Sequence, residues 1–236
     1  MFGKKIKGPI QFHLSETNFC DAWEGESRDC SHELCVIADA DHYTLFYRNG
    51  VFLGAPMPLG GPIYPFSKDI TSRGSRADKK KYLTAKVVCL SKTFNLKVYW
   101  GTKTRFTIID KNTHKAYRVG VSGSFMVAVE PSDGGTNANL FYGKLLTQGD
   151  KMKMDTDALR EKLSDLFVNR VGEQVQECIE NLGRPLASLG GLQPKEFLQI
   201  SNQVYPYVKD VFSDFGLTLT DESKDSVVLN FLIDPA

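Results

Sequence analysis

Residues 117–129 read YRVGVSGSFMVAV, and apolar side chains occupy almost every second position of this run. Side chains point alternately to the two faces of a β-strand, so this spacing predicts one long strand with an apolar face and a small or polar face. Gly123 stands in the one gap of the apolar face. The apolar face consists of Tyr117, Val119, Val121, Phe125, Val127 and Val129.

Shorter segments with the same two-residue rhythm precede this strand. Asn49-Gly50 is the strongest turn signal among them, because both residues tolerate the positive φ of a two-residue hairpin. Trp100-Gly101-Thr102 is expected to interrupt a strand. Many short strands joined by turns indicate an antiparallel sheet or a small open barrel. We expect strands over 34–38, 43–48, 51–53, 83–90, 94–98 and 105–109.

After a turn at 130–135, the spacing of apolar residues becomes helical. It predicts a short helix over 139–147, a long helix from about residue 156 to Leu182, and another from Pro194 to 215. Pro206 lies inside the last apolar stripe without breaking its phase, which favours one kinked helix over two. Strands near 217–219 and 227–233 follow. The predicted fold class is α+β: an N-terminal antiparallel β-sheet, open and barrel-like, then two to three packed helices and a closing C-terminal β segment.

The composition is that of an ordinary globular protein. The 236 residues are 42% hydrophobic and 24% charged, with a formal net charge of +1. A net charge this small provides no global attraction to nucleic acid or anionic lipid. The longest candidate for a membrane span, Gly50 to Phe66, contains four prolines, which a spanning helix does not accommodate. No apolar signal segment follows the basic N-terminus, so the five cysteines are expected to be reduced thiols in the cytoplasm.

One cluster has the residue types of a metal site. Cys30, His32 and Cys35 could offer thiolates and an imidazole to zinc. Zinc sites usually contain a Cys-x2-Cys pair, which this segment lacks, and a buried thiol in a strand also behaves as a small hydrophobe. A small zinc-binding or Cys/His-dependent hydrolytic protein therefore stays open as an alternative. No cofactor is expected.

A second alternative concerns the lysine runs. Lys79 to Lys81, together with the lysines near the N-terminus, could contact the phosphates of a nucleic acid. Solvated charges on loops explain them more simply, and no nucleic-acid partner is expected.

The apolar loop that follows Asn49-Gly50 is the sharpest candidate for an interaction surface. A loop with this many large apolar residues either folds over the core or marks a site for a partner or a membrane surface. The candidate residues are Phe52, Leu53, Met57, Leu59, Ile63, Tyr64 and Phe66.

Several of these segments occur in the order found in one known superfamily. They are the Val-Tyr-Trp-Gly-Thr run of residues 98–102, the turn at Asp110, the strand ending at Val129-Glu130-Pro131, and the Phe-Tyr-Gly-Lys-Leu-Leu run of residues 141–146. With the helix from Asp157 and Phe215-Gly216-Leu217, the chain from about Cys35 to Pro235 resembles the SPFH or band 7 superfamily (stomatin, prohibitin, flotillin and HflK/C). It is most similar to the soluble bacterial members without a transmembrane helix.

This resemblance implies an SPFH-like domain over residues 33–236, after an irregular arm over 1–32. The domain would be β-rich over 33–130, helical over 138–216 and closed by strands over 217–234. The resemblance also implies a non-enzymatic scaffold that forms a homo-oligomer and works with a membrane-protein partner or a membrane surface. Such a protein would be cytoplasmic, or peripheral at the inner face of the cell membrane. No catalytic residue and no small-molecule substrate are implied.

Overall fold

The structure, a computed structural model, describes residues 10–15, 18–26, 36–37, 40–55, 62–63, 84–147, 156–181, 185–186 and 194–236. The chain divides into two compact units, each built from two stretches of sequence. Unit 1 contains residues 1–94 and 129–155, and unit 2 contains residues 95–128 and 156–236. The predicted boundary between residues 32 and 33 lies outside the described residues.

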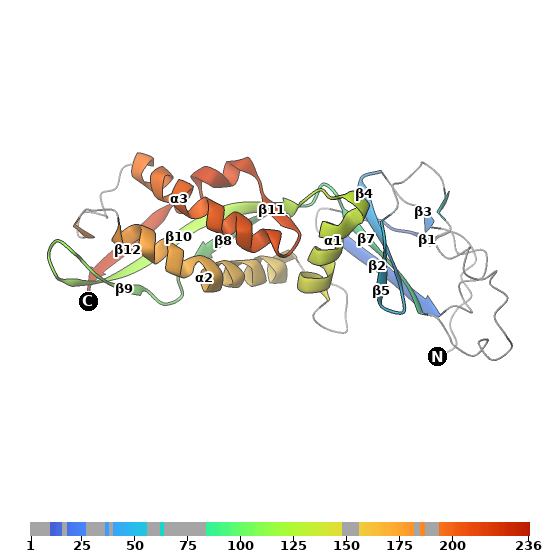
Figure 1. The fold of residues 1–236 in the computed structure, drawn as a ribbon, viewed down its shortest axis with the longest axis horizontal. Coiled ribbons are helices and arrows are strands. Elements are labelled where there is room, and N and C mark those ends of the chain that lie inside the picture. Colours follow the sequence, from blue (N-terminus) through green and yellow to red (C-terminus); the bar gives the residue numbers. More distant parts are fainter. Residues whose placement is uncertain are drawn as a thin grey trace. The chain divides into compact units, whose positions relative to one another are not determined.

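Unit 1 is organised around a four-stranded antiparallel sheet in the order β2-β7-β4-β5 (Figure 1). Its strands are β2 (Cys20–Glu26), β4 (His42–Arg48), β5 (Val51–Gly54) and β7 (Thr84–Ser91). The predicted hairpin joins β4 to β5, and Asn49 and Gly50 have φ values of 49° and 78°. These left-handed conformations fit the two-residue turn that Asn-Gly favours.

Strand β2 was not expected, because residues 1–32 were predicted to form an irregular arm. Its sequence, CDAWEGE, offers Trp23 as its only large apolar side chain, so its alternation is weak. The strand forms because all seven of its residues pair with β7. A smaller sheet joins β1 (Ile10–Gln11), β3 (Val36–Ile37) and β6 (Pro62–Ile63), with β1 parallel to β3.

One face of the unit 1 sheet carries α1 (Thr136–Phe141), which continues as a π-helix over Tyr142–Leu146. Tyr47 of β4 connects to this helix, because its hydroxyl donates a hydrogen bond to Asn139 Oδ1 at 2.7 Å. Phe141 is fully buried and lies 5.3 Å from Phe94 between ring centroids. The predicted short helix over 139–147 is therefore confirmed, although it begins three residues earlier and changes its winding.

Unit 2 contains the long predicted strand, β10 (Ala116–Val129), at the centre of a five-stranded sheet. Its antiparallel neighbours are β8 (Asn95–Gly101), β9 (Phe106–Ile109) and β12 (Asn230–Pro235), and β11 (Leu217–Leu219) completes the sheet. Trp100 and Gly101 do not interrupt β8, contrary to expectation, because both residues pair with β10. The apolar parity of β10 is buried throughout, as predicted.

Two long helices cover the apolar face of this sheet. They are α2 (Thr156–Glu180) and α3 (Pro194–Ser213), which lie side by side in Figure 1. Phe167 of α2 lies 4.3 Å from Trp100 and 5.2 Å from Phe125 between ring centroids. The prediction of one continuous helix across Pro206 is confirmed. The last strand begins at Asn230 rather than at residue 227, because the N–H and C=O of Val228 bond to the Ser201 hydroxyl of α3.

The molecule is thus an α+β protein, as the sequence predicted. It contains antiparallel sheets, three helices and C-terminal strands in its described part, and the strands form three sheets rather than one open barrel. Among the described residues, no helix is both long enough and apolar enough to span a membrane.

Candidate functional site

The first candidate site is the surface of β5. Val51 and Leu53 share one parity of this strand, and their side chains are 63% and 50% exposed. Phe52 has the opposite parity and packs on Tyr47, with 5.5 Å between ring centroids. We call Val51 and Leu53 the β5 surface. It belongs to the apolar segment that the sequence singled out.

The other members of the predicted interaction surface are only partly accounted for. Ile63 belongs to β6, where its backbone pairs with Val36 of β3. Met57, Leu59, Tyr64 and Phe66 lie outside the described residues. Val51 was not among the predicted contact residues, although its alternation with Leu53 was a signal that could have found it.

Strand β5 lies at the edge of its sheet. Within the described part of the chain it pairs with β4 alone, and its sequence, Val-Phe-Leu-Gly, carries no charge. Proteins usually protect exposed edges with lysine, proline or a covering segment, because an edge strand offers unpaired backbone groups to other chains. An uncharged apolar edge is therefore chemically suited to contact with another strand.

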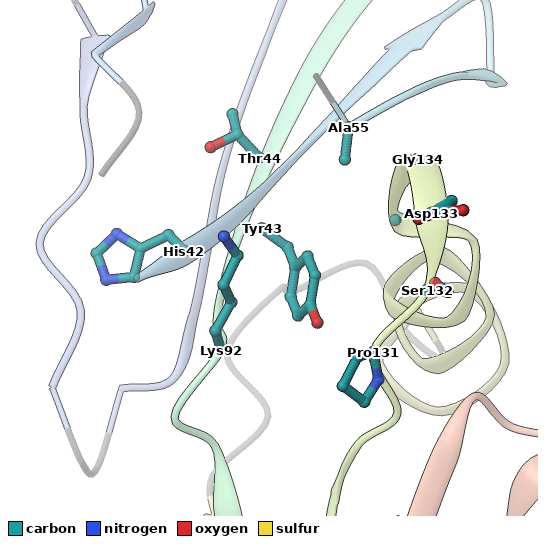
Figure 2. A pocket seen from close by; sticks show the side chains of 10 residues that line it. His42, Tyr43, Thr44, Ala55, Lys92, Pro131, Ser132, Asp133 and Gly134 are labelled. Atoms are coloured by element: carbon teal, nitrogen blue, oxygen red, sulfur yellow. The ribbon is translucent and has the colours of Figure 1, made fainter. Parts of the chain in front are cut away.

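The second candidate site is a cavity of about 580 Å³ within unit 1. Residues 42–44 at the start of β4 form one wall, together with Lys92, and residues 131–135 form the opposite wall, with Ala55 beside them. Figure 2 shows the Tyr43 ring directed toward Pro131, whereas the His42 ring is directed away from residues 131–134. The volume falls within the range of ordinary ligand sites.

The charged groups of this cavity are already engaged or exposed. Lys92 Nζ donates a hydrogen bond to the Ala40 carbonyl at 2.6 Å and lies 5.4 Å from the centroid of the Tyr43 ring. Burial raises the pKa of the Tyr43 hydroxyl, so this group stays protonated near neutral pH. Asp133 is exposed. Nothing in this arrangement resembles a nucleophile held beside a base.

The predicted metal site falls in a part of the chain that the structure does not describe. Cys30, His32 and Cys35, the candidates for a zinc site, lie outside the described residues. Among the residues that the structure does describe, no group of three or more His, Cys, Asp or Glu side chains could hold a metal ion. Burial is the main factor that raises the pKa of the Cys20 thiol to about 12, which suppresses the reactive thiolate.

Comparison of the chain with protein-family models, with curated proteins and with solved structures found no match in any of the three.

Proposed function

We propose that the protein is a non-enzymatic assembly module that associates with a second copy of itself through the β5 surface. The observation that carries this proposal is an uncharged edge strand with two large apolar side chains exposed, Val51 and Leu53. Strand pairing between two such edges would place Val51 and Leu53 beside the same side chains of the second copy and would bond the outer backbone groups of both strands, which have no strand partner within the described residues.

The resemblance to the SPFH superfamily supports the same reading, since it implies a scaffold that self-associates. It extends the proposal to a location at the cytoplasmic membrane surface, through a membrane-protein partner or the lipid surface itself. In this reading the molecule contributes contact area and binds no cofactor or small-molecule substrate.

Light scattering after size-exclusion chromatography tests the proposal. Val51→Asp with Leu53→Asp introduces two carboxylates into the contact, so the double variant should elute as a monomer at concentrations where the parent chain associates. Desolvating an unpaired carboxylate is costly, and this makes the loss large.

Ile109→Asp is a matched control. Ile109 is 64% exposed, close to the 63% of Val51, but it lies on β9 in unit 2. The control variant should associate like the parent chain. A parent chain that is monomeric at high concentration would contradict self-association, and loss of association in the control alone would place the contact in unit 2.

A separate measurement addresses the membrane part of the proposal. Co-sedimentation with vesicles of phosphatidylglycerol and phosphatidylethanolamine should retain the parent chain more than the double variant if the β5 surface also contacts lipid. Equal sedimentation of the two proteins would show that the β5 surface does not contribute to membrane binding. It would leave the test of self-association unaffected.

A further inference from the structure

The sheet of unit 2 has one face on which neither long helix packs. Phe167 of α2 and Phe212 of α3 both contact the face that carries Phe125. Residues that pair across an antiparallel ladder share a face, so the registers of β10 with β8, β9 and β12 assign the alternate residues to the opposite side. We call this side the open face of unit 2. Its exposed members with large or charged side chains are Lys97, Tyr99, Ile109, Arg118, Leu232 and Asp234.

The exposure of the side chains agrees with this assignment. Tyr99 on β8 is 68% exposed, and Leu232 on β12 is 54% exposed. Their chain neighbours Val98 and Phe231 are buried beneath the helices on the other face. The Tyr99 ring is therefore accessible to a ligand.

The open face carries more positive than negative charge. Its cations are Lys97, Arg118 and Arg105, whose side chain lies over Gly120. Its one carboxylate in the paired strands, Asp234, forms an ion pair with Arg105. Within the described residues, Lys97 and Arg118 therefore have no acidic partner.

The helix side of unit 2 has the opposite balance. Helix α2 carries six carboxylates and three basic side chains. The acidic turn over Asp221–Asp225 also lies beside a helix, because Lys224 Nζ in this turn is 5.7 Å from the ring centroid of Tyr205 on α3. The whole chain has a net charge of only +1, but the open face is a local positive surface that is complementary to an anion.

Lys97 and Tyr99 place a cation beside an aromatic ring. They are two residues apart on the same face of β8, and Lys97 Nζ lies 5.2 Å from the ring centroid of Tyr99. A nucleotide offers the matching pair of groups, a base that stacks on an aromatic ring and a phosphate that binds an ammonium group.

Arg118 extends the positive surface along the sheet. Lys97 is opposite Met126 on β10, and Arg118 lies eight residues earlier on that strand. At about 3.4 Å per residue, the two cations are separated by about 27 Å along the strand direction. A linear polyanion can contact both cations at once, whereas a single small anion cannot. Ser122 and Asn230 pair across the ladder between them and offer polar groups to base edges.

The exposed apolar side chains of the open face do not form one patch. Ile109 is opposite Ala116 on one side of β10, and Leu232 is opposite Gly120 on the other side. Arg118 lies between these two positions. Contact with a lipid surface or with the apolar core of a protein interface favours continuous apolar area, so this arrangement favours a nucleic acid.

We propose that the open face of unit 2 binds single-stranded nucleic acid without sequence preference. Tyr99 would stack on a base, and Lys97 and Arg118 would bind phosphates at two points along the strand. No nucleic-acid partner was expected from the sequence, because these residues lie on two strands and only the register of β8 with β10 brings them to one face. The site belongs to unit 2 and the β5 surface belongs to unit 1, so this proposal does not depend on self-association.

Fluorescence anisotropy with a labelled oligouridylate of ten nucleotides tests the proposal. Even at a stacked spacing of about 3.4 Å per nucleotide, this probe spans the separation of Lys97 and Arg118. Two phosphate contacts predict a slope of about −1.4 for the logarithm of affinity against that of salt concentration, which is about a 25-fold loss over a tenfold rise in salt. Oligothymidylate of the same length should bind with similar affinity, because stacking and phosphate contacts do not distinguish the two.

A pair of tyrosine variants tests the stacking contact. Tyr99→Ala should weaken binding of oligouridylate about tenfold or more and leave the salt dependence unchanged. Tyr207→Ala is the matched control, since Tyr207 is 50% exposed but lies on α3. The control variant should bind as the parent chain does, and far-UV circular dichroism should show that both variants are folded.

A pair of arginine variants tests the phosphate contact. Arg118→Gln should reduce the salt slope from about −1.4 to about −0.7, because one phosphate contact is lost. Arg170→Gln changes an exposed arginine of α2 and should leave the slope as in the parent chain.

Three outcomes would overturn the proposal. They are no binding of either oligonucleotide at low salt, a Tyr99→Ala variant that binds as tightly as Tyr207→Ala, and equally tight binding of a duplex of the same length, whose bases are not free to stack on Tyr99. If oligonucleotides do not bind but sedimentation with phosphatidylglycerol vesicles depends on Tyr99, the open face contacts lipid instead.

Discussion

Gly123 lies where a distant segment approaches the backbone of β10. The indole Nε1 of Trp100 donates a hydrogen bond to the Val227 carbonyl at 2.6 Å, and this pair occupies the space in front of Gly123. A Cβ at this position would lie 2.0 Å from the Val227 oxygen and 2.9 Å from the indole nitrogen. Glycine therefore interrupts the apolar parity because a buried hydrogen bond takes the place of its side chain.

Gly123→Ala should accordingly lower the free energy of unfolding by about 1–3 kcal/mol, because the Val227 backbone must move and the Trp100 hydrogen bond weakens. Urea denaturation followed by tryptophan fluorescence measures the loss. Gly120→Ala is the control on the same strand, since its Cβ would meet neighbours at 3.5 Å, an ordinary contact. Equal stability of the two variants would show that the close approach at Gly123 is not a constraint.

Asp110 connects two elements of unit 2. Its carboxylate accepts hydrogen bonds from the amides of Asn112 and Thr113 in the turn between β9 and β10, at 2.8 and 3.3 Å. It also accepts one from the Leu186 amide, beyond the end of α2, at 2.9 Å. Burial disfavours the charge, but these donors outweigh that effect and hold the pKa of Asp110 below its ordinary value.

Because Asp110 joins the turn between β9 and β10 to the segment after α2, the stability of the folded chain should depend on pH. A carboxyl group with a lowered pKa contributes stability above its unfolded pKa of 3.8, and this contribution disappears as the pH falls through the lower folded value. Asp110→Asn should therefore be less stable than the parent chain at pH 7, and the difference should shrink below about pH 4. Thermal unfolding from pH 7 to pH 3 measures it.

Asp165→Asn is a suitable comparison, since Asp165 forms an exposed ion pair with Lys103 on the surface of unit 2. Exposed pairs contribute little, so this variant should match the parent chain closely at every pH. A difference between Asp110→Asn and the parent chain that stays constant down to pH 3 would show that ionisation of Asp110 is not responsible.

At the scale of the whole molecule, each compact unit has its own aromatic core. Phe141 lies in the core of unit 1 beside Phe94 and Phe19, and Phe167 lies in the core of unit 2 beside Trp100 and Phe125. Both phenylalanines are fully buried. The chain passes from unit 1 to unit 2, returns to unit 1 and ends in unit 2, so neither core forms from one continuous stretch.

Shortening a buried side chain in one core should therefore destabilise mainly the unit that contains it. Phe167→Ala should cost about 3–5 kcal/mol, and amide exchange should accelerate in α2, β8 and β10 while β4 and β7 keep their protection. Phe141→Ala should give the reverse pattern. Uniform acceleration across both units in either variant would show that they unfold together.

Local patterns in the sequence were enough to predict the α+β class, the Asn49-Gly50 hairpin, the buried parity of β10 and the continuous helix across Pro206. Each depends on side chains within a few residues of one another, where backbone preference and apolar spacing act directly. The apolar character of β5 was visible for the same reason. Of the two residues of the β5 surface, Leu53 was predicted as a contact residue and Val51 was not.

Contacts between distant residues decided the rest. Strand β2 exists because β7 pairs with it, and β8 continues through Gly101 because β10 supplies partners. The division into two units, each made of two separated stretches, arises in the same way. Pairing and burial between residues far apart in the chain outweigh weak local preferences, and only the folded arrangement specifies which residues meet.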